Sequence, residues 1–348
     1  MATERIKSID FIKGFAILLV VLGHSIQQCN ANPFKDHLFC YIYCFHMPLF
    51  MFVSGLVSYK LVTSNVLSEI RSRGYQLLTP FFFWAFLGKL ILTGTFHASH
   101  WWNIIIDPQQ GLWFFWVLFL VCLLYSTVSY LVEKMYGIGH EKSQYTKKLH
   151  NVYLFTLIIF LYLLLQIADI KTFGLDMVAP YLVYYWAGMM TRKYFHWLKR
   201  VLVRLCWVIV FTYLLLGWFW QFGKAPSFVE NPNSLIHVPY SFITAFCGIF
   251  ASLSLCVKYV SQESTNFLVL KMSFIGQRTL GIYAIHHSFL TLFVVKYIRL
   301  MNLGYSLTLF ITFFLTVTLS ILVHVIVEKG NILPQLLLGK VRLNNCLK

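Results

Sequence analysis

The feature that most constrains the fold is a series of ten apolar stretches, each close to the length of a membrane-spanning helix. A helix needs about 20 apolar residues to cross the hydrocarbon core of a bilayer. The stretches cover residues 10–28, 38–59, 76–96, 112–132, 152–169, 177–191, 201–221, 239–260, 273–295 and 304–327, and the sixth is the shortest. The sequence therefore predicts an all-α, polytopic integral membrane bundle of about ten transmembrane helices.

Composition agrees with a chain that faces lipid over much of its surface. Hydrophobic residues make up 59% of the 348 residues and charged residues 11%, whereas a soluble domain carries about 25% charged residues. The longest polar loop runs from Glu133 to His150 and is too short for a soluble domain. The first apolar stretch is followed by no small-residue cleavage site, so we interpret it as a retained span. We expect one membrane domain over residues 1–348.

The distribution of basic residues predicts the orientation. With the N-terminus in the cytoplasm, most of the 28 Lys and Arg residues fall on the cytoplasmic side. The outer loops then hold Lys35, Lys171, Lys224, Lys296 and Arg299, and the spans hold Lys13, Lys89 and Arg278. This asymmetry follows the positive-inside rule and predicts that both termini are cytoplasmic.

The net charge of +16 has two interpretations. It follows from the positive-inside bias and attraction to anionic lipid headgroups, or it serves an anionic cosubstrate at the cytoplasmic side. Nucleic acid is not an expected partner because the chain has no basic soluble module. Among the eight cysteines, most lie in apolar stretches as core residues. Cys29, Cys40 and Cys44 lie near the outer face, where a disulfide is an open alternative.

The first stretch carries three ionisable residues on nearly one helix face. Lys13 and His24 are eleven residues apart, which brings them to within about 20° of the same face, and Asp10 lies about 40° from His24. Ionisable residues inside a membrane are costly and mark candidate functional sites. His24 is either a structural histidine bonded across helices or a general base for a hydroxyl group.

Two further segments carry candidate residues. In the second stretch, CFHMPLFMFVSG, Pro48 removes a backbone donor and Ser54-Gly55 gives a flexible step, so we expect a broken helix near His46. His46 is an interfacial or a site histidine. Arg71 and Arg73 precede the third stretch. They are either phosphate ligands or ordinary cytoplasmic anchors.

The ninth stretch contains FIGQRTLGIYAIHHSFL, with Arg278 near its start and the adjacent His286 and His287 further along. Adjacent side chains on an α-helix point about 100° apart. The two histidines are therefore not expected to share a metal ion, and no cysteine spacing suggests a zinc site. We predict no metal.

These segments together resemble the acyltransferase-3 family of membrane proteins, especially its fucose O-acetylase-like and surface-polysaccharide O-acetyltransferase branch. The segment RIKSIDFIKGFAILLVVLGHS resembles the family's first-helix motif, with a basic residue and a His eleven apart. FHMPLFMFVSG, GLWFFWVLF, IGQRTLGIYAIHHSF and the late Val-Glu-Lys resemble its later motifs in order. Two departures stand out: Lys13 replaces a frequent Arg, and Gln76 occupies the second position of an arginine pair whose first position is Arg73.

The resemblance implies transfer of an acetyl or similar acyl group from acyl-CoA, with acetyl-CoA as cosubstrate and no bound cofactor, to a hydroxyl of a cell-surface carbohydrate or its lipid-linked precursor. It implies His24 as the base, with Asp10, His46 and His286 in supporting roles. Lys13, Arg71 and Arg73 would hold the phosphates of the donor. It also implies a multi-pass protein of a bacterial inner membrane. The sequence leaves open the acceptor, the oligomeric state and a rival function, a transporter or flippase of a lipid-linked sugar or polysaccharide.

Overall fold

The computed structural model describes residues 7–59, 66–135, 144–168 and 170–340. Within these ranges the chain is helical, and the pairing of Gln221 with Lys224 is the only strand-type bridge. The predicted all-α class is therefore confirmed. The described ranges leave out both chain ends. Among the 28 basic residues and eight cysteines counted from the sequence, those outside the described residues are Arg5, Lys60, Lys142, Arg342, Lys348 and Cys346.

Six helical segments in the described ranges are long and apolar enough to cross a membrane, and they coincide with six of the ten predicted stretches. They are α1 (Lys7–Cys29), the pair α2 (His37–Tyr43) and α3 (His46–Ser58), α4 (Val66–Thr93), α6 (Trp113–Met135), α11 (His237–Tyr259) and α15 (Tyr305–Glu328). The pair α9 (Phe195–Arg204) and α10 (Cys206–Phe219) makes a seventh if it is one span, although it is bent by 75°.

The other three predicted spans are also helical. They correspond to α7 (Gln144–Ala168), to α8 (Leu175–Lys193) and to a broken series. That series consists of α12 (Phe267–Gly276), α13 (Thr279–Ile285), the π-helix η4 (His286–Leu290) and α14 (Thr291–Arg299). The count of ten spans and the cytoplasmic position of the termini stay predictions.

The chain divides into two compact units that interleave in sequence. The first unit consists of Met1–Ser54 and Met190–Ile326, and the second of Gly55–Met189 and Val327–Lys348. One segment of the second unit thus interrupts the first unit along the chain, and its other segment follows it. A single domain over residues 1–348 stays a prediction.

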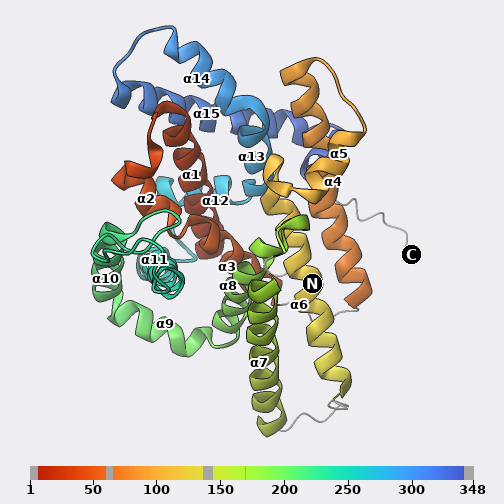
Figure 1. The fold of residues 1–348 in the computed structure, drawn as a ribbon, viewed down its shortest axis with the longest axis vertical. Coiled ribbons are helices and arrows are strands. Elements are labelled where there is room, and N and C mark those ends of the chain that lie inside the picture. The colour runs from red at the N-terminus through yellow and green to blue at the C-terminus, as the bar shows by residue number, and fades with distance from the viewer. Residues whose placement is uncertain (1–6, 60–65, 136–143, 169, 341–348) are drawn as a thin grey trace. The chain divides into compact units, whose positions relative to one another are not determined.

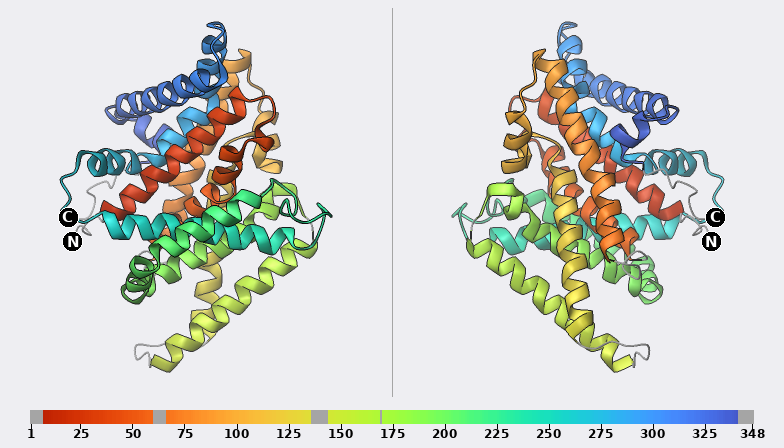
Figure 2. Two further views of the ribbon diagram at one scale, coloured as in Figure 1. Left: turned by 90° about the vertical axis from the view of Figure 1, so that its left-hand side faces the viewer. Right: turned by 90° about the vertical axis from the view of Figure 1, so that its right-hand side faces the viewer.

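In the first unit α1 lies against α12 (Figure 1), and two glycines make this contact close. A Cβ atom on Gly14 would meet the carbonyl oxygen of Met272, and one on Gly276 would meet that of Asp10. Small residues allow such close approach of helix backbones in membranes. The helices α10 and α11 form a second pair in the same unit (Figure 2). The contact of α1 with α12 brings the Asp10 end of α1 next to the ninth predicted span.

The predicted break in the second span is confirmed. The helix stops at Tyr43 and resumes at His46, two residues before Pro48, which has no N–H to donate to the preceding turn. The side chain of Asp36 caps the start of α2 by accepting from the backbone N–H of Phe39 at 3.1 Å. The break places His46 at the first position of α3.

In the second unit α4 and α6 run side by side, as the orange and yellow helices of Figure 2 show. The short helix α16 (Leu333–Leu338) packs on α4, where the indole N–H of Trp84 donates to the carbonyl of Leu337 at 2.8 Å. Gly339 ends α16 with a φ of 60° and lies against the backbone of Gln76. The smaller elements η1 (Pro33–Lys35) of the first unit and α5 (Ser99–Ile106), η2 (Pro108–Gln110) and η3 (Thr172–Gly174) of the second complete the described helices.

Candidate functional site

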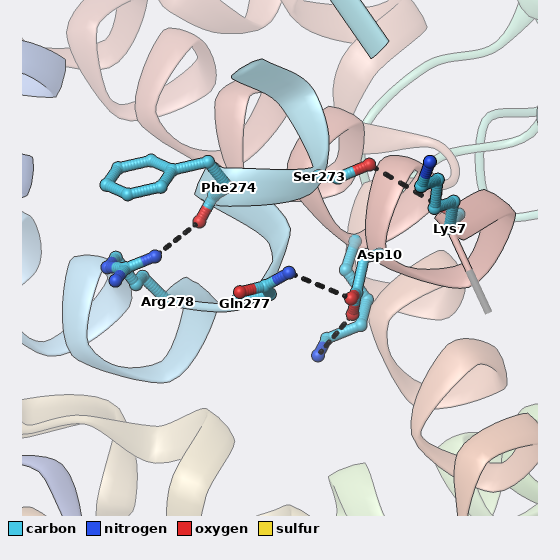
Figure 3. A network of polar contacts seen from close by, with 7 residues as sticks. Lys7, Asp10, Ser273, Phe274, Gln277 and Arg278 are labelled. Carbon is cyan, nitrogen blue, oxygen red and sulfur yellow. Dashed lines mark hydrogen bonds and ion pairs between the residues drawn. The ribbon is translucent and has the colours of Figure 1, made fainter. Parts of the chain in front are cut away.

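One uninterrupted helix, α1, carries Asp10, Lys13 and His24, as their spacing predicted. Asp10 is buried, with 6% of its surface exposed, and its carboxylate lies 3.7 Å from the ammonium nitrogen of Lys13. The side-chain amide of Gln277 also donates to Asp10 Oδ2 at 3.3 Å (Figure 3). Asp10 therefore joins the start of α1 to the joint between α12 and α13 and restrains Lys13.

Neighbouring polar groups at this joint are held locally. The guanidinium of Arg278 donates to the carbonyl of Phe274 at 3.2 Å and lies 3.8 Å from the centre of the Phe274 ring (Figure 3). The hydroxyl of Ser273 donates to the backbone carbonyl of Lys7 at 3.5 Å. The Arg278 contact lies within the α12–α13 joint, and the Ser273 bond connects α12 to the first turn of α1.

Toward the other end of α1, His24 is half-buried and bonded to Gln27, one turn further along the helix. The distance from His24 Nδ1 to Gln27 Oε1 is 3.2 Å, and the hydroxyl of Tyr43 donates to the same oxygen at 3.1 Å. An amide oxygen only accepts, so His24 carries its proton on Nδ1 in this arrangement. The lone pair of the neutral ring is then on Nε2, the atom that can take a proton.

His46 is connected to this group through Tyr43. The ring of His46 lies 4.6 Å from that of Tyr43, and only 4% of His46 is exposed. Its Nδ1 donates to the backbone carbonyl of Ile42 at 2.9 Å. Its lone pair is therefore also on Nε2.

The structure places His286 and His287 in the π-helix η4, so the α-helical angle behind the expectation that they point apart does not describe this turn. The backbone N–H of Thr291 donates to the carbonyl of His286, five residues earlier, which widens the helical turn at this point. The ring nitrogens of His24, His286 and His287 provide one ligand atom each within 4.8 Å of one another. The prediction that no metal is bound stays a prediction.

Arg71 and Arg73 belong to the second unit and differ in their surroundings. The Arg73 guanidinium donates to Ser58 Oγ at 2.7 Å and to Gln76 Oε1 at 3.1 Å, whereas Arg71 is exposed. Gln76, the residue that departs from the family's arginine pair, is thus a hydrogen-bond partner of the first pair position. Both carboxylate oxygens of the buried Glu69, one turn before Arg73, have no hydrogen-bond partner among the described residues.

The structure thus gathers the predicted residues into three groups. Asp10 and Lys13 form the first group. The histidines His24, His46 and His286 form the second group, in the same unit. Arg73 belongs to the other unit and is bonded to Ser58 and Gln76 there. Sequence reasoning missed Gln27, Tyr43 and Gln277. Gln27 follows His24 at a spacing of three, a signal for contact on a helix, but Tyr43 and Gln277 come from other elements.

The alternative of a disulfide near the outer face is not met. Cys29, Cys40 and Cys44 are free thiols. The thiol of Cys29 lies 3.7 Å from Thr312 Oγ1, and that of Cys40 donates to the carbonyl of Phe34 at 3.5 Å. These cysteines act as small, weakly polar packing residues.

Comparisons with known proteins identify the family. The family model described as "Acyltransferase domain" matches residues 6–325. The nodulation protein NolL of Sinorhizobium fredii is 35% identical over 143 residues, which cover 37% of this chain and 39% of that protein. The nodulation protein NolL of Mesorhizobium japonicum is 31% identical over 131 residues, 35% of each chain. The aligned part is thus less than two fifths of the length of these curated relatives, and no solved structure matches. Because the family model matches nearly the whole chain, the chain belongs to the acyltransferase-3 family, as its motifs indicated.

Proposed function

We propose that this protein is a membrane-bound O-acyltransferase. It moves an acetyl or similar acyl group from acyl-CoA to a hydroxyl of a cell-surface carbohydrate or its lipid-linked precursor. Family membership and the apolar helices support this function. The observation that carries it is the state of His24, a half-buried imidazole whose Nδ1 is bonded to Gln27 and whose Nε2 keeps its lone pair.

The chemistry needs one proton acceptor and good positioning. The thioester of acyl-CoA is already activated, so the acceptor oxygen attacks the carbonyl carbon directly while His24 Nε2 takes the hydroxyl proton. A carbon–oxygen bond forms, the carbon–sulfur bond breaks, and the CoA thiolate leaves and receives a proton. Gln27 accepts from Nδ1–H and stabilises the imidazolium that forms during this step. Tyr43 holds Gln27 in turn.

His46 and His286 assist His24 in this proposal. Each is buried and donates its Nδ1–H to a backbone carbonyl, Ile42 at 2.9 Å and Ile282 at 2.8 Å. The fixed rings line the surroundings of His24, and the ring centre of His286 is 5.4 Å from that of His24. Their role is to position the acceptor and to exclude water.

The donor's phosphates are assigned to Lys13, Arg71 and Arg73. Asp10 restrains Lys13, and the exposed Arg71 has the charge that a phosphate needs. Arg73 would have to exchange Ser58 or Gln76 for a phosphate oxygen, because its guanidinium already donates to both. We therefore expect the binding of acyl-CoA to depend most on Lys13 and Arg71, while Arg73 keeps its hydrogen bonds to Ser58 and Gln76 in the second unit. The family assignment disfavours the alternative function, a transporter or flippase of a lipid-linked sugar.

The test is acyl transfer by the purified full chain in detergent or nanodiscs. It uses acetyl-CoA labelled in the acetyl group and a panel of free and lipid-linked sugars. The wild type is compared with His24→Ala and with His196→Ala, which changes an exposed histidine of α9. We expect label on a sugar with the wild type and with His196→Ala, and a loss of at least a hundredfold with His24→Ala, because general-base catalysis contributes about 10²- to 10⁴-fold.

Two results would contradict the proposal. A folded His24→Ala protein that transfers the acyl group at the wild-type rate would exclude His24 as the base. A wild-type protein that neither binds acetyl-CoA nor labels any sugar, but moves a lipid-linked sugar across a vesicle membrane, would establish the transporter instead. If Lys13→Ala and Arg71→Ala both leave the KM for acetyl-CoA unchanged, the assignment of the phosphate ligands is wrong.

A further inference from the structure

Three imidazoles converge at one point of the first unit, and the proposed acyl transfer uses only part of this cluster. His24 comes from α1, and His286 and His287 come from the π-helix η4. The ring centre of His24 lies 5.4 Å from that of His286 and 4.7 Å from that of His287. One nitrogen from each ring lies within 4.8 Å of the other two. Such a triangle of nitrogens has the composition of a three-histidine metal site.

The protonation of two rings prepares them to bind a cation. His286 donates from Nδ1 to the carbonyl of Ile282 at 2.8 Å, and His24 Nδ1 is bonded to Gln27 Oε1 at 3.2 Å. Metal-bound histidines usually donate their second ring N–H to a carbonyl or carboxylate in this way, which fixes the tautomer and the ring orientation. Both rings therefore present Nε2 with its lone pair.

His286 provides the independent observation. It is fully buried, with 0% exposure, and its Nε2 has no hydrogen-bond partner among the described residues. A buried polar atom without a partner is costly, and such an atom in a native structure calls for an explanation such as a bound ion. The π-helix adds to this, because single π-turns occur frequently at functional sites. His286 and His287 both lie in this π-turn.

The distances allow coordination after a small adjustment. Tetrahedral Zn²⁺ binds histidine nitrogens at about 2.0–2.1 Å, which corresponds to nitrogens about 3.4 Å apart. The three nitrogens, which lie within 4.8 Å of one another, must therefore approach by up to about 1.4 Å, through side-chain rotation of the half-buried His24 and His287. The ring of His287 is stacked nearly parallel to that of Tyr283, with 8° between the planes.

We propose that His24, His286 and His287 form a binding site for a divalent transition-metal ion of the Zn²⁺ type. Three imidazole ligands suit Zn²⁺, Cu²⁺ and Ni²⁺ rather than Mg²⁺ or Ca²⁺, and they leave a fourth position for water or another small ligand. A second consequence rests on the proposed function: an ion bound to His24 Nε2 occupies the lone pair that takes the acceptor's proton. Metal binding and acyl transfer then exclude each other at His24.

The test measures binding directly. The purified full chain is stripped with chelator and titrated with Co²⁺, whose visible absorption distinguishes tetrahedral from six-coordinate sites, and Zn²⁺ is then added as competitor. We expect one tetrahedral Co²⁺ per chain, displaced by Zn²⁺. His287→Ala should weaken Zn²⁺ binding at least tenfold, and His196→Ala, an exposed histidine, should leave it unchanged. Less than one Co²⁺ per chain in the wild type, or a six-coordinate spectrum, would overturn the site.

A second measurement separates the two proposals. Zn²⁺ should inhibit acyl transfer by the wild type, chelator should reverse the inhibition, and His287→Ala should transfer at a rate near that of the wild type while losing the sensitivity to Zn²⁺. If His287→Ala does not fold, His287→Asn replaces it, and the Co²⁺ spectrum of the wild type still decides. Transfer without metal binding would overturn the metal site alone. Metal binding by a protein without transfer to any sugar would overturn the proposed function alone.

Discussion

Gln27 gives the sharpest test of how the site sets up His24. Its Oε1 atom accepts from His24 Nδ1 at 3.2 Å and from the Tyr43 hydroxyl at 3.1 Å. The change Gln27→Leu removes this acceptor at similar side-chain volume. A neutral hydrogen bond contributes about 0.5–1.5 kcal/mol, and each 1.36 kcal/mol of activation free energy is tenfold in rate. We therefore expect kcat to fall by about 2- to 13-fold.

The assay is steady-state transfer from labelled acetyl-CoA to the acceptor found for the wild type. Because Gln27 acts on His24 and not on the donor, the KM for acetyl-CoA should stay within about twofold while kcat falls, since the lost interaction matters in the transition state. Gln27→Glu keeps an acceptor oxygen and should restore most of the rate. An unchanged kcat in Gln27→Leu, or equal losses in the Leu and Glu variants, would refute the positioning role.

Three further predictions concern packing and charge. Gly14→Ala forces a Cβ atom against the backbone of Met272 and should lower the stability measured by thermal unfolding by about 1–3 kcal/mol. The control Gly304→Ala has open space around it and should change stability little. Equal effects of the two changes would contradict the close α1–α12 contact. Thr316 is fully buried and its hydroxyl has no hydrogen-bond partner among the described residues. Thr316→Val should therefore leave stability unchanged or raise it by about 1 kcal/mol. A clear loss of stability would mean that the hydroxyl makes a hydrogen bond in the folded protein. Arg73→Ala removes the charged hydrogen bonds to Ser58 and Gln76 and should lower the free energy of unfolding by about 3 kcal/mol. Arg71→Ala changes an exposed residue and should lower it by about 0.5 kcal/mol or less. Similar values for the two variants would exclude a structural role for Arg73.

The parts of the fold that could be predicted are those in which the backbone is regular or broken by a residue with a known effect. The face shared by Asp10, Lys13 and His24 follows from α-helical periodicity because α1 runs without interruption. The break before His46 follows from Pro48, which cannot donate a backbone hydrogen bond. Family recognition also came from sequence alone, since the motifs keep their order along the chain.

The parts that could not be predicted depend on contacts between distant segments. Gln277 bonds Asp10 across 267 positions of sequence, and no local pattern marks that pair. The close approach of Gly14 and Gly276 is what brings these residues together. Likewise, α12, α13, η4 and α14 read as one apolar span, because hydropathy records composition and not the turn at Gln277 and Arg278.

The histidines combine both cases. His46 and His286 each donate Nδ1–H to the carbonyl four residues earlier, at the start of α3 and at the start of η4. A carbonyl has two lone pairs, so it accepts the ring N–H even where it also accepts a backbone N–H, as Ile282 does. This bond is local and follows once the helix is known, and it decides that the lone pair is on Nε2. The surroundings of each ring are decided by tertiary packing. The ring centre of His286 lies 5.4 Å from that of His24, which comes from α1, and the sequence alone carries no signal for that contact.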